Sequence, residues 1–211
     1  MAKAQGRKTR DAEATKRDIL AAATAEFSRK GLGGARVDAI ALGARANKRM
    51  IYHYFGDKDG LYLAVLEATY AAIRTAELEL HLGDRDPVEG MRELVRFTWA
   101  YFIAHPEFLS LLGTENLHQA AYIKRSKRIR ELHSPLVGMI SGLLERGMRE
   151  RVFRAGVDPV QLYVTIAALG FFYLSNRHTL SSIFGRDLSG PRSLAEREQH
   201  IVDVVLTYLQ R

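Results

Sequence analysis

The 211-residue sequence predicts an all-α fold. Apolar residues recur at helical spacing along most of the chain, and residues that start or stop helices stand between these segments. Alternating apolar and polar runs, which are typical of strands, are nearly absent. The apolar content of 47% is sufficient for a packed core. We therefore expect a globular protein built from helices.

The first predicted helix follows a polar and basic segment. Residues 1–13 are expected to form a disordered arm. Thr15 can cap a helix, because Asp18 stands three residues later in the arrangement of a capping box. Gly31 follows two basic residues and is typical of a helix end. The predicted helix therefore spans residues 15–30, with Ile19, Ala22, Ala23, Glu26 and Phe27 at helical spacing.

Two short helical segments follow, over residues 37–44 and 47–55. Only Arg45 and Ala46 separate them, so the two helices must cross at a steep angle, as in a helix-turn-helix. The expected inward-facing residues are Val37, Ile40, Ala41, Ala44, Ala46, Ile51 and Phe55. The expected outward-facing residues of the second segment are Asn47, Lys48, Arg49, Tyr52 and His53. Such a helix fits the major groove of DNA, although spacing alone also allows a solvated basic helix.

The excess positive charge lies in the same part of the chain. The sequence has 31 Lys and Arg residues against 24 Asp and Glu residues, a net charge of +7. Residues 1–60 hold 13 of the basic residues and 7 of the acidic ones, which leaves 18 against 17 in the rest. This distribution favours a polyanionic partner for the N-terminal region alone.

Longer helices are predicted for the remaining sequence. Asp57 caps a helix that begins at Lys58 and ends near His81. Asp158 caps a later helix whose first residue is Pro159, a position that tolerates a missing N–H. The predicted segments after residue 81 are 87–104, 106–118, 122–151 with a break near Ser134–Pro135, 159–178 and 193–210.

The helix-turn-helix region resembles the DNA-binding domain of the TetR family. The matching residues, all in one register, are Ile40-Ala41, Asn47-Lys48, Ile51-Tyr52-His53-Tyr54-Phe55 and Lys58. The resemblance covers about residues 15–62. It implies a transcriptional regulator, by the family's commoner mode a repressor, which binds a palindromic operator as a homodimer and is released by a small-molecule effector. The expected domains are 14–62 for DNA binding and 63–211 for effector binding and dimerisation.

The resemblance also implies roles for single residues. Asn47 is expected to cap the recognition helix, and Lys48 to meet either phosphate or a base edge. Lys58 is expected to meet phosphate, and Tyr52 and His53 to contact the DNA backbone. Arg49 lies early on this helix, and its planar fork of donors is expected to read a base.

Two residues depart from the family pattern. Arg36 replaces the usual Thr or Ser cap of the first short helix, so a cap is lost and a guanidinium gained. Arg45 replaces the usual Gly of the turn, which costs about 1 kcal/mol if the turn is left-handed. The expected DNA-binding residues are therefore Arg36, Arg45, Asn47, Lys48, Arg49, Tyr52, His53 and Lys58.

The remaining sequence offers a dimer face and candidates for effector binding. Residues 159–178 are apolar almost all round, and a helix of this kind needs neighbours on every side. The family packs its last two long helices into a four-helix dimer interface, although both helices could instead fill the core of one subunit. The candidates for effector binding are Tyr70, Trp99, Phe102, Glu115, Asn116, His118, Tyr122, Phe172, Tyr173, Asn176 and His178.

No sequence motif indicates catalysis, a cofactor or a metal. A phosphate loop, a dinucleotide-binding glycine pattern, a nucleophile elbow and the paired-His zinc motif are all absent. Glu115 and His118 could share a metal with His178, but the sequence adds no further ligand. The chain has no Cys and no apolar run of membrane-spanning length, so we expect a cytoplasmic protein without a membrane partner. The alternative function is a small helical enzyme or carrier whose basic N-terminal region binds anions or RNA.

Overall fold

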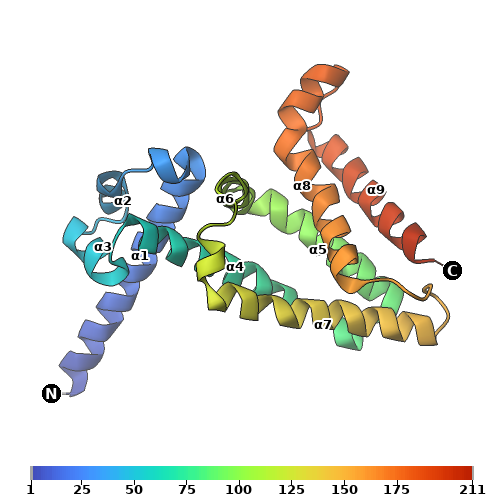
Figure 1. Ribbon diagram of the computed structural model, residues 1–211, viewed down its shortest axis with the longest axis horizontal. Coiled ribbons are helices and arrows are strands. Elements are labelled where there is room, and N and C mark those ends of the chain that lie inside the picture. The colour runs from blue at the N-terminus through green and yellow to red at the C-terminus, as the bar shows by residue number, and fades with distance from the viewer. Residues whose placement is uncertain (1, 211) are drawn as a thin grey trace. The chain divides into compact units, whose positions relative to one another are not determined.

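The structure is all-helical, as the sequence predicts (Figure 1). The computed structural model describes residues 2–210, and within them the side chains of residues 12–132 and 135–210. This described part contains α-helices and short 3₁₀ helices (η) but no strand. In chain order they are α1 (Ala2–Gly34), α2 (Val37–Gly43), α3 (Lys48–Phe55), α4 (Lys58–Leu78), η1 (Leu82–Asp84), α5 (Pro87–Ala104), α6 (Pro106–Leu117), η2 (Ile123–Arg125), α7 (Lys127–Arg149), α8 (Pro159–Phe184) and α9 (Pro191–Leu209).

α1 is longer than expected at its N-terminal end. It begins at Ala2 instead of near residue 15, so residues 2–13 continue the helix, which corrects the expectation of a disordered arm over 1–13. This stretch is rich in Ala, Lys and Arg, which favour helix, and it contains no Pro and only one Gly. The predicted stop at Gly31 appears as a kink within α1, because Gly31 has a φ of 65°, which Gly adopts without strain, and a last helical turn continues to Gly34.

The chain forms two compact units, and the first consists of Met1–Ala71 and Glu107–Ile129. Within it α1 packs on α2, and α2 packs on α3. The buried side chains at these contacts include Ile19, Phe27, Ile40 and Ile51, which confirms the inward faces predicted from spacing. The predicted domain boundary at residue 62 falls inside α4, and the division into domains stays a prediction.

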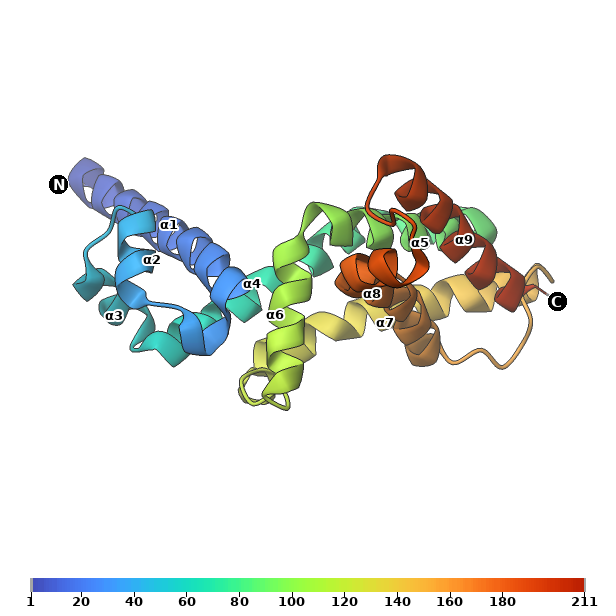
Figure 2. The ribbon, with the colours of Figure 1, turned by 90° about the horizontal axis from the view of Figure 1, so that it is seen from above.

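The second unit consists of Ala72–Pro106 and Arg130–Arg211. α5 packs against both α8 and α9, and α8 and α9 lie side by side (Figure 2). Met91 and Leu94 of α5, Ile166 of α8 and Val205 of α9 are buried in this core. Every helix in residues 2–210 is too short or too polar to cross a membrane.

Two helices in the C-terminal half differ from their predicted bounds. The break expected near Ser134–Pro135 is wrong, because α7 continues from Lys127 to Arg149 with Pro135 inside it. Pro135 removes one helical hydrogen bond, but Glu131, four residues earlier, is exposed, so water can hydrate the carbonyl that loses its partner. α8 extends past the predicted end at residue 178 and stops only before Gly185, whose φ is 59°.

Candidate nucleic-acid interface and effector residues

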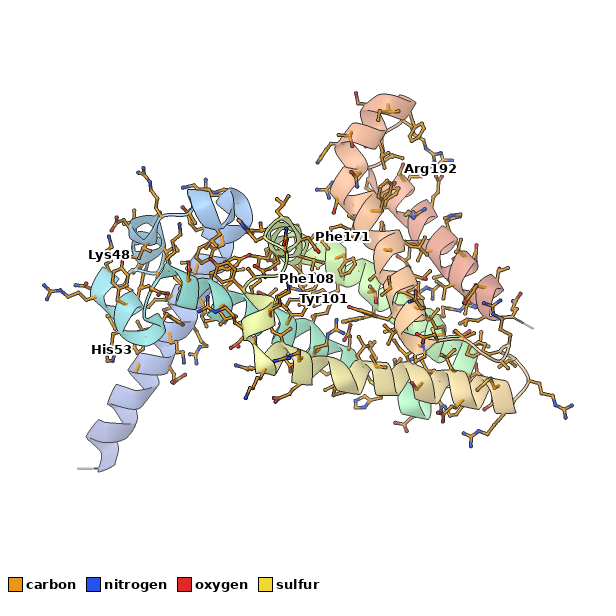
Figure 3. The ribbon with its side chains drawn as sticks, in the orientation of Figure 1. Lys48, His53, Tyr101, Phe108, Phe171 and Arg192 are labelled. Carbon is orange, nitrogen blue, oxygen red and sulfur yellow. The ribbon has the colours of Figure 1, made fainter. Side chains whose placement is uncertain are left out.

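One side of the recognition helix α3 is buried against the first unit, and the other side faces solvent. Ile51 is fully buried and holds α3 against the rest of the first unit. The residues predicted to face outward are exposed, with 43% of Tyr52 accessible to solvent. Lys48 and His53 project from the outer side of α3 in Figure 3. A short exposed helix that carries cations, amides and hydroxyls is suited to groove binding.

The N-terminus of α3 is capped as expected. The Oδ1 of Asn47 accepts a hydrogen bond from the backbone N–H of Arg49 at 2.9 Å. This bond fixes the first turn of the helix and leaves the Arg49 guanidinium exposed. Arg49 therefore starts from a rigid backbone position, which is what base reading by a forked donor requires.

The turn between α2 and α3 has the backbone strain that is expected of a non-Gly residue in a left-handed turn. Arg45 has a φ of 50°, in the left-handed region. A non-Gly residue in this conformation costs about 1 kcal/mol. The neighbouring backbone is nevertheless satisfied, because the N–H of Ala46 donates to the carbonyl of Ala41 at 3.0 Å. The strained turn presents the exposed Arg45 side chain beside the start of the recognition helix.

The start of α2 is held by a carboxylate of α1 instead of by its own cap. Arg36 stands at the N-cap without a side-chain capping bond, as the departure from the family pattern predicts. Its backbone N–H donates to Oε1 of Glu26 at 3.3 Å. The same buried carboxylate accepts from Lys30 Nζ at 2.7 Å and from Arg29 Nη2 at 3.1 Å. The hydrogen bond from Lys30 is the main cause that lowers the pKa of Glu26 to about 2.

Lys48 is paired with an acidic residue that sequence reasoning missed. Its Nζ lies 2.7 Å from Oδ1 of Asp38 on α2, and this hydrogen bond raises the pKa of Lys48. Both side chains remain accessible, at 44% for Lys48 and 77% for Asp38. The sequence spacing of Lys48 and Asp38 does not predict this ion pair, because the pair depends on how α2 and α3 cross. Lys48 is therefore not an unopposed cation in the absence of DNA.

Lys58 and Asp57 lie at the start of α4, in the last part of the candidate interface. The Oδ1 of Asp57 accepts from the N–H of Gly60 at 2.7 Å, which confirms the predicted cap of α4. Lys58 is the first residue of α4, so its ammonium group and the helix N-terminus carry positive charge at the same point. The eight predicted DNA-binding residues all belong to the first compact unit.

Comparison with known proteins identifies the family of this chain. Residues 19–65 match the family described as bacterial regulatory proteins, tetR family, and residues 87–205 match the tetracyclin repressor-like C-terminal domain. The chain is 41% identical over 206 residues to the HTH-type transcriptional repressor NicS of Pseudomonas putida, across 98% of this chain and 97% of NicS. The chain belongs to the TetR family.

Other relatives agree with this assignment. The HTH-type transcriptional repressor SCO4008 of Streptomyces coelicolor is 38% identical over 141 residues, across 66% of this chain and 69% of that protein. The crystal structure of the putative transcriptional regulator SCO4942 from Streptomyces coelicolor superposes with a TM-score of 0.69 and 26% identity, and covers 92% of this chain and 98% of that chain. This TetR-family chain is therefore a transcriptional regulator and not an enzyme, and binding of operator DNA and of small-molecule effectors is typical of the family.

Three of the candidate effector residues come together in the second unit. Trp99 and Phe102 of α5 and Tyr173 of α8 are buried, and the rings of Trp99 and Tyr173 meet edge to face at 5.7 Å. Gly170 permits this approach of α8 to α5, since a Cβ atom there would lie 3.2 Å from the Phe102 ring. The Tyr173 hydroxyl donates to the carbonyl of Leu188 at 3.0 Å.

Five of the other candidates lie in the first unit, and three of them contact residues outside their own helix. The ring of Tyr70 meets that of Phe108 at 5.4 Å. Glu115 is buried, and its Oε2 accepts from the N–H groups of Tyr122 at 3.3 Å and Ile123 at 3.0 Å. The Tyr122 ring lies 5.0 Å from that of Tyr62 on α4.

The remaining candidates face solvent or are half-buried on their helices. Asn116 donates to the carbonyl of Leu112 and Asn176 to that of Phe172, both at bonding distance within their own helices. The Phe172 side chain is 59% exposed. His118 and His178 are exposed as well. An effector role for the full set stays a prediction.

A buried ion pair on α4 was missed by the sequence analysis. Arg74 and Glu77 are 3% and 1% exposed, and Arg74 Nε lies 3.1 Å from Glu77 Oε2. Arg74 Nη2 also donates to the hydroxyl of Tyr163 on α8 at 3.2 Å. One signal in the sequence could have revealed the pair. Both residues stand in the helical stripe that begins with the buried Tyr70 and Ile73, where a charged side chain is unusual.

Proposed function

We propose that this TetR-family regulator is a repressor that binds a palindromic operator in the cytoplasm as a homodimer and is released by a small-molecule effector. The observation that carries the DNA-binding part is the exposed face of α3, with a capped N-terminus and cations around it. NicS, with 41% identity over nearly the whole chain, is named a transcriptional repressor, and this supports repression as the direction of control.

A second copy of the chain is the proposed cover for an apolar face on α8 and α9. Val160 and Val164 of α8 are 47% and 51% exposed, and Phe172 on the same helix is 59% exposed. On α9, the Tyr208 side chain is 46% exposed. Exposed apolar side chains on two adjacent helices favour a self-complementary interface, which would match two recognition helices to the two halves of a palindrome.

The assembly is tested by light scattering at micromolar concentration. A dimer has twice the subunit mass of 23.7 kDa. Phe172→Asp places a charge within the proposed interface and should shift the protein towards the monomer. A wild-type mass equal to that of one subunit would refute the dimer.

Operator binding is tested by separating base reading from phosphate contact. An operator is first selected from a random duplex pool, and affinities are then measured for it and for its single-base variants at several salt concentrations. Arg49→Ala should cost about 1 to 3 kcal/mol on the operator and relax the preference at one base pair of each half-site. Lys58→Ala should weaken all sequences alike and reduce the salt dependence by about one phosphate contact per subunit.

Tyr52 and His53 should behave like Lys58 in lacking base discrimination, with a smaller salt effect because neither side chain is an ammonium or a guanidinium group. If Arg49→Ala left base preferences unchanged while Lys58→Ala altered them, the proposed docking of α3 would be wrong. The effector part is tested separately, by whether any small molecule lowers operator affinity and contacts the aromatic cluster of Trp99, Phe102 and Tyr173.

A further inference from the structure

The buried cluster of Arg74, Glu77 and Tyr163 contains polar atoms that nothing in the described chain satisfies. Arg74 Nε and Glu77 Oε2 are 3.1 Å apart, but their alignment does not make a hydrogen bond. Arg74 Nη1 and Glu77 Oε1 are also buried and have no hydrogen-bond partner. Buried polar atoms are nearly always paired, so this cluster needs a reason beyond folding.

Stability does not supply that reason. A buried ion pair is at best a weak contributor to folding, because removing two charges from water offsets their attraction. Apolar residues of the same size would fill this part of α4 without leaving donors and acceptors unpaired. A strongly perturbed and buried ionisable pair is instead typical of a binding site.

The charge balance of the cluster indicates which ligand it would accept. Arg74 carries a guanidinium group, which is a cation. Burial raises the pKa of Glu77 to about 7, and the charge of Arg74 opposes this shift only in part. The carboxyl group of Glu77 is therefore easily neutralised. When Glu77 is neutral, the buried Arg74 guanidinium leaves the cluster with a net positive charge. Such a cluster is complementary to an anion.

We propose that Arg74, Glu77 and Tyr163 are the recognition point for the effector, and that this effector is a small organic molecule with a carboxylate group. The proposal rests on the proposed function, because it assigns a ligand class to that regulator. One oxygen of the ligand carboxylate accepts from Arg74 Nη1, and the other accepts from the protonated Glu77. The ligand thereby pairs with Arg74 Nη1 and one oxygen of Glu77, two of the four unpaired atoms, and guanidinium is the side chain best suited to carboxylates.

Tyr163 gives the cluster an apolar and accessible side. Its ring lies under the guanidinium, with Arg74 Cζ 5.4 Å from the ring centroid, and its side chain is only half-buried. The hydroxyl and the ring fix one side of the Arg74 fork, so Nη1 is the part left to a ligand. A flat, partly apolar acid would contact this ring while its carboxylate meets Nη1.

The test uses acetate, benzoate and 3-phenylpropionate as carboxylate probes, and benzamide as the neutral counterpart of benzoate. Binding is followed by thermal shift and by the fluorescence of Trp99, which is the only Trp of the chain and lies in the same unit. At millimolar concentration at least one carboxylate should raise the melting temperature and change the fluorescence, and benzamide should do neither. Absence of any response to all three acids would overturn the proposal, and an equal response to benzamide would overturn the carboxylate assignment.

Two variants assign the response to the cluster. Arg74→Met should weaken carboxylate binding by roughly tenfold or more, since a charge-assisted bond is lost. The double variant Arg74→Met, Glu77→Met removes both charges and should fold with unchanged or higher melting temperature while it no longer responds to the acids. The matched control is Arg92→Met, which breaks the exposed pair of Arg92 and Glu89 at the same spacing on α5. Equal probe binding in wild type and double variant would overturn the site.

Measurements of operator affinity distinguish a failure of this proposal from a failure of the proposed function. The double variant should bind operator DNA as tightly as wild type but should not be released by the acid that binds wild type. If wild type itself binds no operator, the proposed function fails, while the probe measurements still decide the site. If wild type binds the acid at Arg74 and operator affinity does not change, the pocket exists but the effector assignment is overturned.

Discussion

Replacing Asp38 with Asn tests whether the ion pair with Lys48 restrains DNA binding. The pair is exposed, so its loss should change the free energy of unfolding only slightly. A carboxylate about 7 Å from one phosphate in water is repelled by about 0.6 kcal/mol before salt screening.

Two subunits double this penalty, so Asp38→Asn should tighten binding by about 1 kcal/mol, or roughly fivefold, at low salt. The increase should appear with DNA of any sequence, because it is electrostatic. Lys48 would also be released from its 2.7 Å partner and become available to phosphate.

Fluorescence anisotropy with a labelled random-sequence duplex measures this effect at low and at physiological salt. Asp84→Asn is the matched control, since it makes the same charge change at an exposed residue of the second unit. An unchanged or weaker affinity of Asp38→Asn, or an equal gain in the control, would refute the assignment of Lys48 and Asp38 to the DNA-facing surface.

Three further substitutions test the framework of the two units. The pKa of Glu26 is lowered from 4.5 to about 2 in the fold, so its contribution to stability is present above pH 4.5 and lost as the pH falls towards 2. Glu26→Gln should therefore unfold more easily at neutral pH in urea and lose part of the wild-type pH dependence below 4.5, and an unaltered profile would contradict this reasoning. Arg45→Gly should raise the free energy of unfolding by about 0.5 to 1 kcal/mol through relief of the left-handed strain, while DNA affinity falls; a less stable variant would show that the turn is not strained. Gly147→Ala should destabilise by about 1 to 3 kcal/mol or more, because its Cβ would lie 2.1 Å from the ring of the buried Phe153, and near-wild-type thermal stability would contradict that packing.

The features that the sequence predicts correctly are those set by neighbouring residues. Asn47, Asp57 and Asp158 each accept a hydrogen bond from an N–H two or three residues later, so a short stretch contains everything that the cap needs. The inward positions Ile40 and Ile51 likewise follow from helical spacing alone. These local rules were sufficient to place the recognition helix and its exposed residues.

The features that the sequence did not predict depend on contacts between distant segments. Lys48 and Asp38 meet only because α2 and α3 cross, and Arg74 meets Tyr163 across 89 residues of sequence. The uninterrupted course of α7 through Pro135 is a similar case, since the local rule indicates a break. The effector residues stay a prediction, because an aromatic side chain in a cavity wall and one in a solid core have the same sequence pattern.

The first compact unit consists of two separate segments of the chain, and this limits how the DNA-binding part of the regulator can be cut from the rest. Its DNA-binding helices share a core with Glu107–Ile129, where the Tyr122 ring meets Tyr62 of α4 and the buried Glu115 holds the backbone beside it. A chimera that joined the first 71 residues to a foreign sensor domain would lack Glu107–Ile129, which forms one side of that core. Tyr62, now fully buried, would then need a substitute partner from the new domain. Engineering a new specificity onto this protein should therefore exchange α3 residues within the intact chain, or graft both segments of the unit together.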